Sequence, residues 1–304
     1  MNAPSSSSLA GHTASGVNRL REDALRELPH LRTRYADAFR PVTRNGILGV
    51  TLAVGLLALF ITGFAELGFS FAKMIAGLDQ LGKFVILMWP PTPGTMSRFL
   101  LFVHALGETV AIAALGTVLA AILALPFGFL AAKNVVANRI VHFLSRRLLD
   151  TVRGVDTLIW ALLWVNVVGL GPFAGVLAIM CSDTGALGKL FSEAIETANR
   201  RPVEGVLSAG GGRLAAVRFG ILPQVLPVFA SQLLYYFESN TRSATIIGIV
   251  GAGGIGLHLS EQIRTLEWQH VAFLVILILA TVAVIDALST RLRSAIIGSR
   301  PAAT

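Results

Sequence analysis

Residues 100–132 read LLFVHALGETVAIAALGTVLAAILALPFGFLAA and include one charged side chain, Glu108. About 20 apolar residues in a helix cross a hydrocarbon core about 30 Å thick, so this stretch is long enough to span a membrane. Pro126 near its end is expected to kink the helix or to mark its exit, because proline removes one backbone hydrogen bond. Small residues predict a face that another helix approaches closely. They recur at three- and four-residue spacing, at Ala113, Gly116, Ala120 and Ala124.

Other apolar windows in the chain are close to the length of a membrane span. The chain as a whole is 54% hydrophobic and 14% charged, whereas soluble globular proteins are about 25% charged. The turn GLGP at 169–172 separates two of the windows. We therefore expect an all-α, polytopic membrane protein with about six transmembrane helices. Besides the stretch quoted above, the windows lie at about 46–66, 148–169, 173–195, 224–256 and 270–290.

The lysines and arginines are unevenly distributed around these windows. If the N-terminus is cytoplasmic, 20 of the 25 lie in cytoplasmic segments, four lie on the opposite side, and Arg242 lies inside a window. Cytoplasmic loops of membrane proteins carry the excess of positive charge. The distribution therefore predicts that both termini are cytoplasmic.

The first 45 residues are polar and carry seven arginines, with no apolar run near the start. This composition does not favour a cleavable signal peptide. An interfacial helix and a disordered basic tail are both compatible with it. We interpret 1–45 as a basic cytoplasmic segment, and 46–98 as a first transmembrane helix followed by an extracytoplasmic connection.

Residues 249–259, IVGAGGIGLHL, contain glycines in the G-x-G-x-x-G spacing of a dinucleotide-binding loop. Such a loop also needs a soluble βαβ unit and an acidic residue about 20 positions later, where this chain has the apolar window 270–290. The nucleotide interpretation is therefore disfavoured. In a membrane bundle, dense glycines allow close helix packing or let the backbone leave helical geometry beside a cavity. We expect a turn at the end of a helical core, formed by Gly251, Gly253, Gly254 and Gly256.

The longest loop within the predicted helical core covers 193–227 and reads EAIETANRRPVEGVLSAGGGRLAAVRFGILPQVLP. Pro202 predicts the first residue of a short helix over 202–209, with Glu204 in its first turn, and the glycines at 210–212 predict its end. A basic segment then leads back into the membrane. A short helix held at the membrane surface between two spans is a docking element for a cytoplasmic partner.

This loop, about 196–223, resembles the cytoplasmic signature of the permease subunits of ATP-binding cassette (ABC) importers. That signature, the EAA loop, reads Glu-Ala-Ala, three residues, Gly, nine residues, then Ile-x-Leu-Pro. Glycine and valine replace the two alanines, and glycine replaces the isoleucine at Gly220. The helix should therefore be less rigid than usual, since a glycine within a helix costs about 1 kcal/mol relative to alanine. The resemblance implies that ATPase coupling falls to Glu204, Gly205, Val206, Gly210, Leu222 and Pro223.

The C-terminal part of the chain resembles the methionine- and phosphonate-type members of that family. The sequence VGAGGIG before the last span is similar to both types. The stretches PVEGVLSAGG, FGILPQVLP and VGLGPFAGVLAI are most similar to the phosphonate type. The resemblance covers about 98–293 and implies a methionine-importer-like, type I permease bundle over 99–295 in the bacterial inner membrane.

The resemblance also implies that other chains supply the energy and the substrate. This sequence contains no G-x-x-x-x-G-K-[ST] loop, so ATP and Mg²⁺ are expected on a partner. The implied assembly is a homodimer of permeases with two ATPase subunits docked on their loops and an extracytoplasmic solute-binding protein. In that assembly this chain contacts membrane lipid, is not an enzyme, holds no cofactor of its own and has no nucleic-acid partner.

Charged side chains inside an apolar window are costly unless they are paired or face water. Glu238 and Arg242 lie four residues apart on one helix face, with Asn240 between them. Two interpretations remain open. The pair neutralises itself within the helix, or Arg242 helps an anionic phosphonate through the translocation path, because a guanidinium binds such oxygens through two hydrogen bonds. We take all three as candidates for the translocation path.

Two weaker polar patterns lie in the third and fourth windows. Arg153 and Asp156 form a possible pair at the start of the third window. Asp183, within the fourth, is interpreted as a helix cap or as a partner of Lys189, nearly two turns away. A direct role in substrate binding is the less favoured interpretation of Asp183.

A metal site is not predicted. His104 and Glu108 lie four residues apart near the outer end of the second window. Two ligands without a third are typical of an interfacial polar pair rather than of a metal site. We therefore assign no metal.

The favoured function is an importer permease for a phosphonate or a related phosphorus oxyanion. Alternatives are an ABC permease for another small solute, such as methionine or a phosphate ester, and an ion-coupled secondary transporter. In the latter, Glu238 or Asp183 would carry protons or sodium ions. The loop at 202–223 discriminates between the two classes, because a secondary transporter has no need of it. Selectivity of these importers resides mostly in the binding protein, so the sequence predicts a substrate class and not one compound.

Overall fold

The computed structural model describes residues 29, 44–136 and 138–298. The predicted basic segment 1–45 lies outside the described residues, apart from Pro29 and the first residues of helix α2. The choice between an interfacial helix and a basic tail lies outside them as well.

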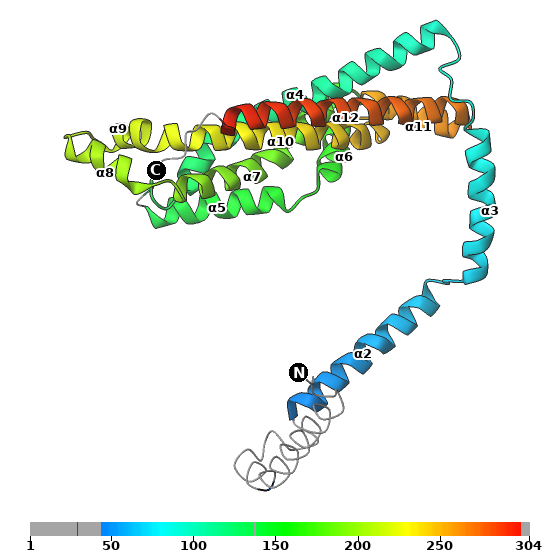
Figure 1. Ribbon diagram of the computed structural model, residues 1–304, viewed down its shortest axis with the longest axis horizontal. Coiled ribbons are helices and arrows are strands. Elements are labelled where there is room, and N and C mark those ends of the chain that lie inside the picture. Colours follow the sequence, from blue (N-terminus) through cyan, green and yellow to red (C-terminus); the bar gives the residue numbers. More distant parts are fainter. Residues whose placement is uncertain (1–28, 30–43, 137, 299–304) are drawn as a thin grey trace, which may run out of the picture. The chain divides into compact units, whose positions relative to one another are not determined.

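Regular structure in the described part of the chain is entirely helical, as the sequence predicts. Figure 1 shows the helices coloured in chain order from blue to red. They are α2 (Arg44–Glu66), α3 (Phe71–Leu87), α4 (Met96–Ala131), α5 (Arg139–Arg153), α6 (Thr157–Val168), α7 (Pro172–Glu196), α8 (Arg200–Ser208), α9 (Arg213–Ala215), the π-helical turn η1 (Ala216–Ile221), α10 (Leu222–Ile249), α11 (Ile255–Arg264) and α12 (Trp268–Gly298).

The chain divides into two compact units, 1–79 and 80–304, and α3 lies across the boundary between them. In the first unit, α2 covers the predicted first span, because Ile47–Glu66 is long and apolar enough to cross a membrane. None of the span is buried within its own unit, and an apolar helix of this length is suited to lipid. The connection that follows it contains α3, a helix that the sequence had not suggested.

The core of the second unit is built on the contact between α4 and α7, with α10 packed against both. The small face predicted on α4 is confirmed, because Ala113, Ala120 and Ala124 are completely buried. Gly116 lies so close to α7 that an added Cβ would stand 2.7 Å from the Ile179 side chain. Small residues therefore set the distance between the two central helices.

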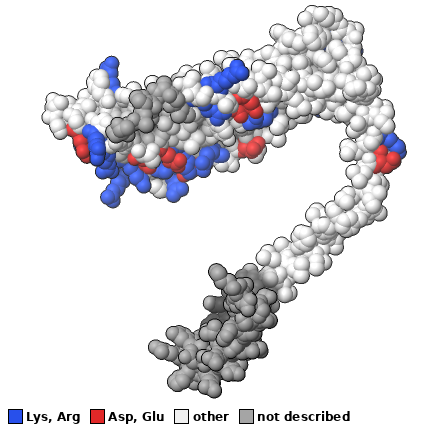
Figure 2. All heavy atoms as spheres, viewed as in Figure 1, with Lys and Arg blue, Asp and Glu red and all other residues white. Residues whose placement is uncertain are grey.

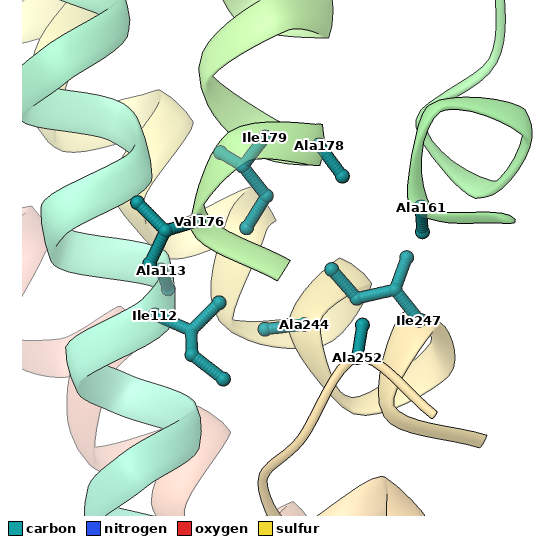
Figure 3. Close-up of a cluster of buried hydrophobic side chains, with 9 residues drawn as sticks. All are labelled: Ile112, Ala113, Ala161, Val176, Ala178, Ile179, Ala244, Ile247 and Ala252. Carbon is teal, nitrogen blue, oxygen red and sulfur yellow. The ribbon is translucent and has the colours of Figure 1, made fainter. Parts of the chain in front are cut away.

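Figure 3 shows an apolar cluster in which α4, α6, α7, α10 and the glycine turn after α10 meet. Lipid is as apolar as these side chains, so in a bilayer the cluster stabilises the bundle through close packing rather than through removal from water. Its members are Ile112, Ala113, Ala161, Val176, Ala178, Ile179, Ala244, Ile247 and Ala252.

Five helices of the described residues are long and apolar enough to cross a membrane. They match five of the six predicted windows, and α5 together with α6 accounts for the sixth if the bent pair is counted as one span. The predicted fold class is therefore confirmed. The five are Ile47–Glu66, Met96–Ala131, Pro172–Glu196, Arg213–Ile249 and Trp268–Ile296.

The window predicted at 148–169 was wrong as a single helix. α5 and α6 meet at an angle of 84°. Asp156 starts the second helix, because its carboxylate accepts a hydrogen bond of 2.8 Å from the backbone N–H of Leu158 and so caps α6. α6 has 12 residues, which is about 18 Å and too short to cross a bilayer alone. The predicted pair of Arg153 with Asp156 was also wrong, since Asp156 serves as this cap.

The window predicted at 224–256 was wrong at its C-terminal end, whereas α10 begins at Leu222, close to the predicted start. The helical path reaches back through η1 to Arg213, and it ends at Ile249. The glycine run then forms a turn, and α11 begins at Ile255. The turn is therefore outside the span, at the end of the helical core where the sequence places it.

Candidate functional site

The predicted docking loop forms α8, at one end of the bundle in Figure 1. Its N-cap is Asn199, whose side chain accepts a hydrogen bond of 3.0 Å from the backbone N–H of Arg201. Asparagine is a strong N-cap, so the helix starts two residues before the predicted start at Pro202. The prediction of Pro202 as the first helical residue, with Glu204 in the first turn, was therefore wrong.

Gln224 joins the start of α8 to the start of α10. Its side-chain oxygen accepts a hydrogen bond of 3.0 Å from the backbone N–H of Asn199, and its side-chain nitrogen donates one of 3.1 Å to the Asn199 carbonyl. The same nitrogen donates one of 2.6 Å to the Gly220 carbonyl. A displacement of α8 therefore acts directly on the first turn of a membrane-spanning helix.

The end of α8 is close to the predicted position. The helix ends at Ser208, and Gly210 has a φ of +84°, a conformation that favours glycine. Gly220 packs against α8 so closely that an added Cβ would stand 2.9 Å from the Val203 Cα. Gly205, in contrast, has open space around it. The glycine at the family's isoleucine position therefore allows η1 to lie directly on α8.

The outer surface of α8 combines charged and apolar groups. Glu204, Gly205 and Gly210 are exposed, and Val206 is half-buried. Leu207 is also largely exposed. Exposed apolar side chains beside a carboxylate, at the tip of a bundle, are typical of a surface that docks another protein. Of the two remaining predicted coupling residues, which begin α10, Leu222 is half-buried and Pro223 is exposed.

Glu238 and Arg242 form the ion pair within α10 that their spacing suggests, with 3.8 Å between nitrogen and oxygen. α12 adds two further charges to it. Arg293 donates a hydrogen bond of 2.7 Å to the other oxygen of Glu238, and Arg242 lies 3.4 Å from Asp286. We call these four residues the α10–α12 network. It contains two acidic and two basic side chains, so its formal charge is balanced.

Asn240 does not lie with its predicted companions. It is 4% exposed and faces α4 and α7, where its side-chain nitrogen donates to a carboxylate oxygen of Asp183 and, at 2.8 Å, to the Thr117 hydroxyl. The three side chains form a buried polar contact among the central helices. The predicted pairing of Asp183 with Lys189 was wrong, because Asp183 faces Asn240 instead.

Lys189 belongs to a charged cluster that the sequence had not indicated. Its amine lies 3.4 Å from a carboxylate oxygen of Asp150 on α5. Arg147 and Arg153 approach the same carboxylate at 3.8 and 3.9 Å. We call these four residues the α5–α7 cluster. It joins positions 39 residues apart, and the signal in the sequence was the presence of Lys189 and Asp150 inside windows that are otherwise apolar.

The glycine turn is a tightly packed junction. Gly251, Gly253 and Gly254 have φ of +101°, +82° and +71°, which only glycine adopts readily. The Gly251 carbonyl accepts a hydrogen bond of 2.9 Å from the backbone N–H of Gly171, just before α7. An added Cβ on Gly253 would stand 2.7 Å from the Pro172 nitrogen. The glycines of the turn therefore allow it to pack closely against the start of α7.

α4 holds the other side of this turn. The Thr109 hydroxyl accepts a hydrogen bond of 2.8 Å from the Ile255 N–H, and Glu108 accepts one of 3.3 Å from the Gly254 N–H. Gly256 lies against α10, where an added Cβ would stand 2.9 Å from the Gly248 Cα. The Glu108 carboxylate thus contacts the backbone of the turn, while His104 is exposed. Among the described residues no group of three metal-ligating side chains occurs.

Membrane-length helices around a small-residue core, with a short exposed helix at one end, define an integral membrane protein with a surface that can dock a partner. Residues 124–298 match the family described as "Binding-protein-dependent transport system inner membrane component". The chain belongs to this family. It is the membrane permease of an ABC importer and not an enzyme itself, which confirms the class predicted from the loop and leaves no support for an ion-coupled carrier.

Two curated relatives are phosphorus-compound permeases. The chain is 37% identical over 248 residues to the putative phosphite transport system permease protein HtxC of Stutzerimonas stutzeri, covering 82% of this chain and 87% of the relative. It is 36% identical over 249 residues to the phosphate-import permease protein PhnE of Mycolicibacterium smegmatis, covering 82% of this chain and 43% of the relative.

A solved structure shares the fold. One chain of the inward-facing MetNI methionine ABC transporter superposes with a TM-score of 0.59 at 18% identity, covering 66% of this chain and 99% of that chain. At this identity the likeness establishes the fold alone. The predicted methionine-importer-like bundle is thereby confirmed.

Proposed function

We propose that this permease carries a phosphonate or a related phosphorus oxyanion, such as phosphite or phosphate, into the cytoplasm. The observation that carries the proposal is the similarity of 82% of the chain to relatives named for phosphite and phosphate transport. Charged side chains within the spans support it, because an anion in a bilayer needs cations or water along its path. Methionine or another small solute is the competing substrate.

The proposed assembly is a homodimer of this chain with two ATPase subunits and an extracytoplasmic binding protein. ATP and Mg²⁺ would bind to the ATPases. Both termini would be cytoplasmic, since that orientation places most lysines and arginines inside. In the view of Figure 2, the charged side chains of the bundle gather toward the half that carries α8, in keeping with this orientation.

In this mechanism α8 is the coupling element. Closure of the ATPase pair would push the two α8 helices together, and the Gln224 hydrogen bonds would pass the displacement to α10. α10 would then rock against α4 and α7, exposing the path to one side of the membrane and then to the other. The proposed coupling residues are the six predicted ones, Glu204, Gly205, Val206, Gly210, Leu222 and Pro223.

Arg242 is the proposed contact for the oxyanion on α10. Its side chain is 47% exposed, and a guanidinium can hold two oxygens of a phosphonate at once. Glu238 would position Arg242 through the ion pair, and Asn240 would hold α10 in register with α7. An Arg242→Ala permease that assembles normally and transports at the full rate would remove this role.

Co-purification of the ATPase with the permease tests the coupling role. Glu204→Lys places a cation on the exposed face of α8, so recovery of the ATPase should fall by about tenfold if the contact is a charge-assisted one. Ser208→Lys is the matched control, because it adds the same side chain at the exposed last residue of the same helix. Equal recovery with both variants would contradict the role of Glu204.

Uptake of radiolabelled phosphite, phosphate and methionine tests the substrate class. The purified importer would be reconstituted in liposomes with its binding protein and ATP. The proposal expects uptake of a phosphorus oxyanion and none of methionine. Uptake of methionine alone would assign the chain to the other substrate class.

A further inference from the structure

We propose that the α5–α7 cluster forms a binding site for the oxyanion inside the permease. Lys189 and Arg153 are its main contacts. The inference rests on the proposed function, because it names the residues that would hold the proposed class of substrate. It concerns a site other than Arg242, because the cluster lies between α5 and α7 and not between α10 and α12. The ligand chemistry is a tetrahedral phosphorus oxyanion with two or more free oxygens.

The cluster lies within the length of the spans. Lys189 is seven residues from the last residue of α7, which places its Cα about 10 Å inside that end of the helix. Arg146 of α5 pairs with Glu196 at 3.3 Å, at the α8 end of the bundle. α5 continues seven residues further to Arg153, whose backbone lies beside Gly185, about one turn of α7 further from that end than Lys189. Asp150 lies between Arg146 and Arg153 on α5.

Two glycines of α7 create the close approach that joins the cluster. An added Cβ on Gly185 would stand 2.7 Å from the Arg153 backbone nitrogen and 2.8 Å from the Leu149 carbonyl oxygen. An added Cβ on Gly188 would stand 2.6 Å from the Leu149 side chain. α5 therefore lies directly on the α7 backbone. This contact brings the start of the next turn, at Lys189, within reach of Asp150.

The charge of the cluster is not balanced. Three cations surround one carboxylate, and no other carboxylate in the described residues lies within 4.0 Å of Lys189, Arg147 or Arg153. Two other acids of α7 have partners outside the cluster. Glu193 and Glu196 pair with Arg146.

The two remaining acids close to α5 and α7 are also occupied. Asp156 caps α6, and Asp183 accepts the hydrogen bond of Asn240. The cluster therefore keeps two uncompensated positive charges. Uncompensated positive charge at membrane depth is tolerated where the side chains face water or an anion.

The side chains are accessible, which fits water and not lipid as their surroundings. Arg153 is 48% exposed, Arg147 67% and Lys189 25%. Charged heads this exposed at the depth of Lys189 would be costly in hydrocarbon. A water-filled path along α5 and α7 removes that cost. The same path would deliver an anion to the cations.

The contacts to Asp150 are loose enough for exchange. They measure 3.4, 3.8 and 3.9 Å, whereas close charge-assisted hydrogen bonds measure about 2.7–2.9 Å. An arriving oxyanion can therefore take the ammonium of Lys189 and the guanidinium of Arg153 while Asp150 stays nearby. Asp150 would weaken the hold on the anion, so that it leaves again toward the cytoplasm.

The test uses the complete importer in liposomes, with radiolabelled phosphite and inorganic phosphate as probes. Lys189→Gln and Arg153→Gln should each lower the initial rate of uptake by about tenfold or more, because each removes a charged partner of the anion. Lys189→Arg keeps the charge and should stay within about twofold of wild type. Arg146→Gln is the matched control, since its charge is already balanced by Glu193 and Glu196.

Co-purification of the ATPase separates transport from assembly. Recovery of the ATPase should remain near the wild-type value in all four variants, because none of the substituted residues lies on α8. Wild-type uptake rates in Lys189→Gln and Arg153→Gln would overturn the proposal. Equal losses in Lys189→Gln and Lys189→Arg would overturn it too, since they would point to packing and not to charge.

Two further arms separate the alternatives. If wild type takes up neither phosphorus oxyanion but carries another anion, and Lys189→Gln slows that anion, the substrate class fails while the binding site stands. Liposomes of phosphatidylcholine alone test for an anionic lipid as the occupant, because the phosphate of phosphatidylcholine is neutralised by its own choline group. A Lys189→Gln defect that is present in liposomes with phosphatidylglycerol and absent without it would assign the cluster to lipid and overturn the proposal.

Discussion

The α10–α12 network and the α5–α7 cluster both place four charged side chains between two helices, but they differ in charge and in closeness. In the network, two acids balance two bases, and Arg293 holds Glu238 at 2.7 Å. In the cluster, one acid faces three bases, and its shortest contact is 3.4 Å. The close Arg293–Glu238 contact fastens α10 to α12, whereas Arg242 keeps looser contacts of 3.8 and 3.4 Å. An unbalanced, loose cluster is free to bind something else.

The position of each set on the fold supports this distinction. Glu238 is 13% exposed and joins α10 to α12, so its removal would mainly loosen that contact. Asp150, Arg147 and Arg153 lie on α5, the helix that leads into the 84° bend with α6, and Lys189 approaches them from α7. Broken helices within a bilayer are tolerated where they line a cavity. The α5–α6 bend therefore lies where a path would be expected.

The largest expected effect comes from separating α5 from α7. Gly185→Leu would drive its Cβ to within 2.7 Å of the Arg153 backbone, so α5 must move and the cluster must break. We expect uptake below about 5% of wild type and a lower melting temperature in detergent, since overpacking typically costs about 1–3 kcal/mol.

Gly107→Leu is the matched control for that variant. It lies on α4 with nothing within 4 Å of an added Cβ, so uptake and melting temperature should stay close to wild type. Equal losses in both variants would show that any leucine in these helices is harmful, and would remove the argument from the Gly185 contact.

Breaking the α10–α12 network should affect stability more than transport. Arg293→Gln removes the close partner of Glu238 and leaves Arg242, 3.8 Å away, as its cation. We expect the melting temperature of the purified permease to fall, corresponding to about 1–3 kcal/mol for a buried group that loses its hydrogen bond. Uptake per folded molecule should fall less than in Lys189→Gln. The opposite order would reverse the roles assigned to the two sets.

The Asp150→Asn variant sharpens the comparison by raising the excess charge of the cluster. The oxyanion should then bind more tightly and leave more slowly. We expect the concentration for half-maximal uptake and the maximal rate to fall together, each by about two- to fivefold, as for a site whose ligand is held too strongly. A maximal rate that stays unchanged would contradict the role of Asp150 in release.

The smallest expected effect on the transport rate is that of a substitution in the glycine turn. Gly253→Leu would clash with Pro172, where an added Cβ stands 2.7 Å from the backbone nitrogen, so yield of the assembled permease should fall. The fraction that assembles should transport at nearly the wild-type rate. A variant that assembles fully and transports nothing would place the turn in the path itself.

The sequence predicted the helices whose signal is local. The apolar windows located α2, α4, α7, α10 and α12, and the small face of α4 predicted a close contact with another helix, which the structure shows to be α7. The α5–α6 bend was not predicted, because the average hydropathy of a window does not register a single helix cap such as Asp156. The start of α8 was predicted too late for a similar reason. Asn199 caps the helix, but Pro202 is the more conspicuous helix-start signal in the sequence.

The polar contacts were less predictable, because most join distant positions. Glu238 and Arg242 are neighbours on one helix, and their pairing followed from spacing. Asp183 meets Asn240 57 residues away, and Lys189 meets Asp150 39 residues away. Only the packing of α7 against α5 and α10 decides those partners. The unbalanced cluster is therefore visible only once the fold is known.

The most direct test of the central claim is a side-by-side measurement of phosphite uptake by Lys189→Gln and Arg242→Gln importers with equal ATPase activity. The account predicts a loss of about tenfold or more for Lys189→Gln, against about two- to fivefold for Arg242→Gln, whose charge is already shared with Glu238 and Asp286. A larger loss for Arg242→Gln, or wild-type uptake by Lys189→Gln, would contradict it.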